Sequence, residues 1–177
     1  MTPRAPFNEL RDAAARGDWD GCRSASAAAL TRLSWGQARP LVLRALRDRR
    51  PVFQALHPQI AWPGPWLAGA TVQPDWEVEP EGPGGGNFIQ ALESLAAAEN
   101  HPEQWVEDAV EAVAGAIMTE VIVVGAAAYP ERWRRWYRAA QLGQVTDDLE
   151  PIVYHPDAQA AARRGWLAWA ESLAQVQ

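Results

Sequence analysis

The chain has 177 residues, a hydrophobic content of 48% and a formal net charge of −6. This length fits one folded core, and this apolar content excludes a globally disordered chain. The single cysteine, Cys22, excludes an internal disulfide, and the net negative charge argues against general nucleic-acid binding. Residues 1–16 lack the apolar stretch of a secretory signal, so we expect a cytoplasmic protein.

Three helices are expected in the first third of the chain. Runs of alanine favour helix, and polar caps, prolines and glycines mark the boundaries. Ser34 and Gln37 have the spacing of a capping box, which indicates the start of the third helix. Pro51 should kink or break that helix before Phe53, because a proline removes one helical hydrogen bond. The expected spans are 6–17, 18–33 and 34–56.

Residues 58–87 are different in character, with six prolines and six glycines. A long irregular stretch inside a small domain is uncommon and is often functional. Trp62, Trp66 and Trp76 do not suit a fully solvated linker, so we expect part of the segment to pack on the core. One short helix is expected at 64–69.

The second half of the chain is predicted to be helical, and its longest helix spans 103–127. Glu120 is the only charged residue between residues 112 and 128. Because the run is otherwise uncharged and apolar, a membrane span is an alternative. This apolar run is at the short limit for a span and carries a glutamate, so a buried central helix is favoured. Further helices are expected to begin at 87, 130, 147 and 156.

The predicted fold is therefore all-α. We expect one domain over residues 1–177, a helical bundle of about six to eight helices with the long Pro/Gly-rich irregular segment at 58–87. Most of the ten tryptophans should be buried around the central helix, since indoles contribute large apolar areas to a core.

No constellation of catalytic or metal-binding residues emerges. His57, His101 and His155 each precede a proline, which places them at helix boundaries and not on one helical face, where paired metal ligands lie. Convergence of the three histidines in space is the remaining alternative. The glycines at 84–86 lack the strand and the lysine of a phosphate loop. We therefore predict no catalytic residue, metal or cofactor.

Glu103, Glu107 and Glu111 form a row at i, i+4 and i+8 of the predicted central helix. Such a row could hold a divalent cation, but the solvated start of a helix is the simpler interpretation, because negative charge is favoured there. Like charges at this spacing repel each other, so the row indicates a cationic neighbour.

Charge is unevenly divided along the chain. Residues 1–50 sum to +5, residues 51–131 to −12 and residues 132–177 to +1, and all 16 basic residues are arginine. The simpler interpretation is that the arginine-bearing ends pair with the acidic middle, and the alternative is an acidic surface for a cationic partner. In 132–138 we expect the aromatic side chains in the core and the arginines paired with the acidic middle.

Glu120 has apolar neighbours at the adjoining helical positions, so it must be paired, protonated or at the edge of the apolar stripe. An ion pair with an arginine is the simpler expectation. A poised carboxyl group would instead indicate a functional site.

Together these patterns favour a non-enzymatic helical interaction module, of the adaptor or immunity type, that binds a protein partner of basic character. Nucleic acid and membranes are not expected as partners, and an exposed tryptophan patch would favour a homodimer. The alternative is a small-molecule-binding or metal-dependent enzyme with a pocket near segment 58–87 and Glu120. The candidate binding residues are Glu120, Trp62, Trp66, Trp76, Glu77, Glu79 and Glu81.

Overall fold

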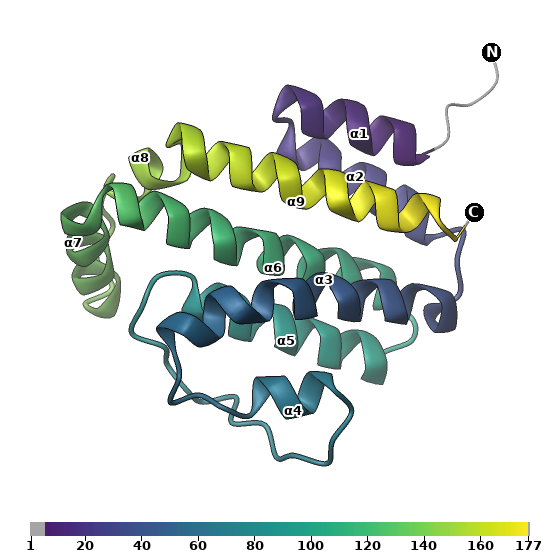
Figure 1. Cartoon of the computed structure of the whole chain (residues 1–177), viewed down its shortest axis with the longest axis horizontal. Helices are drawn as coiled ribbons and strands as arrows, with labels where there is room; N and C mark the ends of the chain where they lie inside the picture. The colour runs from purple at the N-terminus through teal and green to yellow at the C-terminus, as the bar shows by residue number, and fades with distance from the viewer. Residues whose placement is uncertain (1–5, 177) are drawn as a thin grey trace.

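The computed structural model describes residues 6–176, and within that span every regular element is a helix (Figure 1). This confirms the all-α prediction. There are nine helices in the described residues, one more than the upper end of the expected range. The two five-residue helices lie close to the short helices expected at 64–69 and from 147. The helices are α1 (Pro6–Arg16), α2 (Trp19–Leu30), α3 (Trp35–Leu56), α4 (Pro63–Leu67), α5 (Gly85–Asn100), α6 (Trp105–Ala128), α7 (Pro130–Gln141), α8 (Leu149–Val153) and α9 (Pro156–Ala174).

The central helix of the bundle is α6, as the sequence predicted. It packs along α5, α9 and α3, and α2 and α8 also contact it (Figure 1). By length and composition α6 could cross a membrane, but 67% of its most apolar window is buried inside the protein. The surrounding helices therefore cover most of the apolar surface that a lipid bilayer would otherwise cover.

The third helix does not end at Pro51, so of the kink or break expected there the break does not occur. The capping box forms as predicted, with Ser34 as N-cap and Gln37 closing it. The helix then continues through Pro40 and Pro51 to its last residue. Both prolines are exposed, so water can satisfy the carbonyl groups that lose their helical partners, and buried Phe53 anchors the final turn.

Only two tryptophans are fully buried, Trp166 and Trp169, so the expectation that most of the ten would be was wrong. The core consists largely of alanine, leucine and isoleucine. Helices that meet at alanine residues pack too closely together to leave room for many indole rings. The other eight tryptophans lie half-buried at the rim of the core, with part of each ring in contact with solvent. Trp169 donates a hydrogen bond from Nε1 to Ser26 Oγ at 3.1 Å.

The irregular segment contains α4, close to the short helix expected at 64–69, and it ends earlier than expected, because α5 begins at Gly85 and not at Asn87. The residue before α5, Gly84, has a φ of +72°, a left-handed conformation that favours glycine. A Cβ atom there would also lie 2.6 Å from the carbonyl oxygen of Thr119. Glycine therefore lets the turn before α5 lie directly against α6.

Candidate functional site

The segment 75–81 carries four acidic side chains on its outer face. Asp75, Glu77, Glu79 and Glu81 are all exposed, whereas the residues between them are half-buried or buried. None of these four carboxylates has an arginine partner among residues 6–176. We call residues 75–81 the acidic segment, since its outward face presents negative charge that the described chain does not neutralise.

The inward side of this region is held by three indole rings, which we call the tryptophan cluster: Trp62, Trp66 and Trp76. Their ring centroids are 5.0 to 6.0 Å apart and every pair meets nearly edge to face. This is a favoured geometry, because the positive ring edge meets the negative ring face. All three also pack against the main core. The prediction that part of the irregular segment packs back on the core is confirmed.

Beside the acidic segment lies an open groove of about 880 Å³, which we call the α5–α7 groove. Its lining comes from residues 76–80, which form the first wall, from α7, which forms the second wall and stands at one end of the bundle (Figure 1), and from α5. Trp76 lines the first wall, and Trp136 with Tyr137 lines the second. The polar side chains of the groove are Glu79, Asn87, Gln90, Glu93 and Gln141.

The groove carries two carboxylates and no cationic side chain. Glu79 and Glu93 are exposed and have no ion-pair partner in the described part of the chain. Carboxylates attract a cation by their negative charge, and aromatic rings attract it through the negative potential of their faces. The groove is therefore suited chemically to a positively charged group.

The arginines of α7 do not pair mainly with the acidic middle of the sequence, so that expectation was wrong. Arg135 contacts Asp148 at 2.8 Å and Arg132 lies 3.9 Å from the same carboxylate, while Arg134 pairs with Glu131 on its own helix. The turn after α7 brings Asp148 back beside the helix. Arg132 and Arg135 therefore pair with this nearby carboxylate. The hydrogen bond from Arg135 holds the pKa of Asp148 below its usual value.

The aromatic residues of α7 are also not core residues, contrary to expectation. Trp133, Trp136 and Tyr137 are half-buried, and Trp133 lies 5.0 Å from Trp136 and 5.8 Å from Tyr137 between ring centroids. Trp133 packs on a small second apolar cluster around Ile152. Because α7 touches mainly the end of the bundle, its aromatic stripe is left partly open and forms the wall of the groove.

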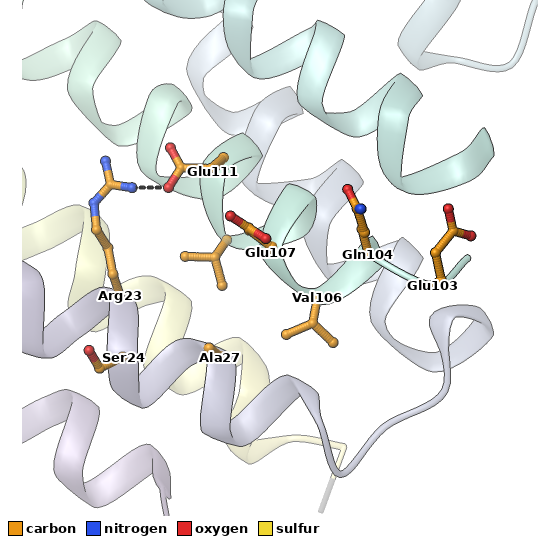
Figure 2. Close-up of a pocket in the computed structure, with 9 residues that line it drawn as sticks. Arg23, Ser24, Ala27, Glu103, Gln104, Val106, Glu107 and Glu111 are labelled. Atoms are coloured by element: carbon orange, nitrogen blue, oxygen red, sulfur yellow. Dashed lines mark hydrogen bonds and ion pairs between the residues drawn. The ribbon is translucent and has the colours of Figure 1, made fainter. Parts of the chain in front are cut away.

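A second groove, of about 440 Å³, lies between α2 and the start of α6 (Figure 2). It contains the predicted glutamate row, Glu103, Glu107 and Glu111, and Arg23 of α2 pairs with Glu111. The cationic neighbour that the spacing of the row indicated is therefore present. With Arg23 counted, this groove has a formal charge of −2, the same as the α5–α7 groove, but only the α5–α7 groove has no cationic side chain in its lining.

Glu120 lies between two arginines and does not line either groove. Its Oε2 is 3.1 Å from Arg49 Nε, and its Oε1 is 3.5 Å from a terminal nitrogen of Arg164. Arg49 comes from the N-terminal third of the sequence and Arg164 from the C-terminal third. The carboxylate thus joins both arginine-bearing ends to the acidic middle.

The three histidines lie at helix boundaries, as predicted: His57 ends α3, His101 ends α5 and His155 precedes α9. His57 lies beside Gly85 at the start of α5, so the whole length of that helix separates it from His101. Within residues 6–176 no three histidine, cysteine, aspartate or glutamate side chains are grouped as metal ligands. The alternative of converging histidines was therefore wrong.

No model of a protein family, no curated protein and no solved structure matches this chain. What the site does must therefore be argued from its own geometry and chemistry.

Sequence reasoning missed half of the α5–α7 groove. It singled out Trp76 and Glu79, but not Trp136, Tyr137 or Glu93. The aromatic stripe of α7 was visible as a helical pattern and was assigned to the core. Whether other helices cover this stripe depends on the tertiary packing of α7, which the local sequence does not show.

Proposed function

We propose that this protein is a non-enzymatic interaction module that binds a basic segment of a protein partner through the acidic segment and the adjoining α5–α7 groove. The observation that supports this most directly is the unneutralised charge of the acidic segment. Arginines from both ends of the chain pair with Glu99, Glu111 and Glu120, yet four neighbouring carboxylates at 75–81 stay exposed without an arginine.

The shape of the groove favours a macromolecular segment over a small molecule. Small-molecule sites typically enclose about 70–90% of their ligand, whereas this groove is largely open to solvent. Aromatic residues are enriched at protein interfaces, and Trp76, Trp136 and Tyr137 are all half-buried here. An extended basic peptide could lie along the acidic segment and place its side chains in the groove.

The test uses a fluorescein-labelled peptide of alternating glycine and arginine, measured by fluorescence anisotropy against the full chain. The test variant replaces Glu77, Glu79 and Glu81 by glutamine. We expect it to weaken binding by about tenfold or more and to reduce the salt dependence of the affinity, because these contacts are screened by salt.

The control variant changes the net charge equally, through Asp147→Asn, Glu150→Gln and Glu171→Gln, at exposed positions away from the groove. It should bind the peptide like the unaltered protein. An equal loss of peptide affinity in both variants would show that net charge alone causes the effect and would contradict a specific site. Absence of binding to the unaltered protein would refute the proposed function.

A further inference from the structure

We infer that the α5–α7 groove holds one arginine side chain of the partner between two aromatic walls, Trp76 on one side and Trp136 with Tyr137 on the other. This inference rests on the proposed function and adds to it the anchor residue. Long-range attraction by the carboxylates of the acidic segment and capture of one side chain in the groove are separate steps, and Glu79 is the one carboxylate that takes part in both.

Both aromatic walls are held in place before any ligand arrives. Trp76 contacts Trp62 at 5.0 Å and Trp66 at 5.7 Å between ring centroids, so the tryptophan cluster fixes its orientation. Trp136 lies 5.0 Å from Trp133, which is itself packed on the second apolar cluster. Rings that are already oriented lose little side-chain entropy when a cation binds against them.

The groove offers an arginine side chain more than aromatic faces. A guanidinium group is planar, stacks on aromatic rings and has five N–H donors, all of which need acceptors when water is displaced. Glu79 and Glu93, whose carboxylates are acceptors, line the same groove, and so do Asn87, Gln90 and Gln141, whose amide groups each have one acceptor oxygen. Lysine has a compact, strongly hydrated ammonium group with three donors, so it matches this arrangement less well.

The size of the groove agrees with a side chain that arrives as part of a longer segment. A single arginine occupies only part of about 880 Å³, so neighbouring residues of the same segment fit in the remainder. The acidic segment continues directly from the groove wall, because Glu79 belongs to both. Other basic residues of the partner would therefore lie along the outward carboxylates.

The first experiment uses N-acetyl-arginine methylamide as the probe, with its uncharged citrulline analogue as control. Indole N–H signals of the isotope-labelled full chain are followed by NMR, and Trp76 and Trp136 are assigned from single tryptophan-to-phenylalanine variants. The arginine compound should shift the signals of Trp76 and Trp136, and the citrulline compound should not. Equal shifts by both compounds, or no shift at these two rings, would overturn the inference.

The second experiment measures affinity for the glycine–arginine peptide in variants of the second wall. Trp136→Leu should weaken binding about five- to tenfold, and Trp136→Phe, which keeps a ring, should lie between it and the unaltered protein. An equivalent glycine–lysine peptide should bind the unaltered protein more weakly than the arginine peptide. The melting temperature of each variant checks that the fold is intact, and Tyr137→Leu gives an independent measurement if Trp136→Leu fails to fold.

The outcomes separate this inference from the proposed function. If the glutamine variant at 77, 79 and 81 loses the peptide while Trp136→Leu binds normally, the anchor is refuted and the proposed function stands. If the unaltered protein does not bind the peptide, both are refuted. A dimer of the free protein that Trp136→Leu abolishes would assign the groove to a second copy of this chain and would overturn the arginine anchor.

Discussion

At the end of α3, His57 lies buried under the glycine-rich turn that precedes α5. Its ring is 4.9 Å from that of Phe53, and a Cβ atom on Gly82 or Gly85 would come within 2.7 Å of the imidazole. Burial lowers the pKa of His57, and a hydrogen bond to the Pro83 carbonyl opposes this shift only in part. Its Nε2 is buried and has no hydrogen-bond partner in the described structure. The folded protein therefore favours the neutral imidazole.

This burial predicts that the protein loses stability on mild acidification. The unfolded chain takes up the His57 proton near its ordinary pKa of about 6.5, whereas the folded protein resists it until a lower pH. The stabilisation is thus complete above about pH 6.5 and is lost as the pH falls towards the lowered pKa. The melting temperature, measured by circular dichroism, should fall between about pH 7 and about pH 5.

The matched variants for this prediction are His57→Leu and His101→Gln. The leucine variant removes the titrating group, so its melting temperature should depend less on pH between about pH 7 and about pH 5. His101 is exposed, so its replacement should leave the dependence unchanged. An unaltered pH profile in His57→Leu would show that other groups cause it.

Cys22 is the second residue whose surroundings determine its chemistry. It is fully buried in α2, and burial raises the pKa of its thiol to about 12, with the carboxylate of Asp18 adding to the effect and Arg16 opposing it. Thiolate is the reactive form, so the native protein should not react with a maleimide at about pH 8. Mass spectrometry should show labelling only after unfolding in guanidinium. Rapid labelling of the native protein would instead reveal local opening of α2.

At the scale of whole elements, close approach between helices depends on single glycines. Gly125 of α6 faces α8 so closely that a Cβ atom would lie 2.1 Å from the carbonyl oxygen of Ile152. Because that atom belongs to the backbone, it cannot move aside like the end of a flexible side chain. Alanine at this position must therefore push α8 away from α6.

We expect Gly125→Ala to lower the free energy of unfolding by about 2–3 kcal/mol, in the range of overpacking in a dense core. Gly36→Ala is the control, since its Cβ would meet only Ser34 Oγ, at 3.9 Å. In the exposed first turn of α3, alanine should raise stability by up to about 1 kcal/mol. Chemical denaturation measures both, and a neutral Gly125→Ala would contradict the close contact.

Sequence patterns correctly predicted helix boundaries at capping residues and histidine–proline pairs. They did not predict that a helix continues through an internal proline. The capping residue Ser34 and the histidine–proline pairs mark real boundaries, because caps act on neighbouring backbone groups. Pro51 did not end α3, since the packing of buried Phe53 beyond it outweighs one lost hydrogen bond. Local propensity is a weak guide wherever tertiary contacts compensate for it.

For the molecule as a whole, the uneven distribution of charge along the sequence leads to ion pairs between distant parts of the chain. Besides the local pair Arg134–Glu131, four ion pairs among residues 6–176 connect the arginine-bearing ends to the acidic middle: Arg23–Glu111, Arg39–Glu99, Arg49–Glu120 and Arg164–Glu120. They satisfy only part of the negative charge. Pairing between ends and middle and an exposed acidic surface are therefore both present, although the sequence analysis treated them as alternatives.

A double-mutant cycle on Glu120 and Arg49 tests this connection. Their side chains are 24% and 13% exposed, between the cases of surface and buried ion pairs. We expect Glu120→Gln and Arg49→Met each to cost about 1–2 kcal/mol in unfolding free energy, with a coupling of about 1 kcal/mol. The exposed pair Glu131 and Arg134 is the control, with a coupling of under about 0.5 kcal/mol. Equal coupling in both pairs would contradict a special role for Glu120.

The candidate site was harder to predict than the fold, for a geometric reason. Its residues come from segment 76–80, from α5 and from α7, and no periodicity within any one of them shows that the three meet. The acidic segment was visible as composition, and Trp76 was visible as an apolar residue in an irregular region. Trp136 could be recognised as a wall residue only once α7 was placed at the end of the bundle.

The tryptophan cluster has a consequence for the thermodynamics of any binding at this face. Loops that carry binding residues commonly become ordered only when the ligand arrives, and the lost conformational entropy then weakens the complex. Here the rings of Trp62, Trp66 and Trp76 hold the irregular segment against the core in the free protein. That entropy is lost once, during folding, so a ligand at this face would meet a segment that is already ordered.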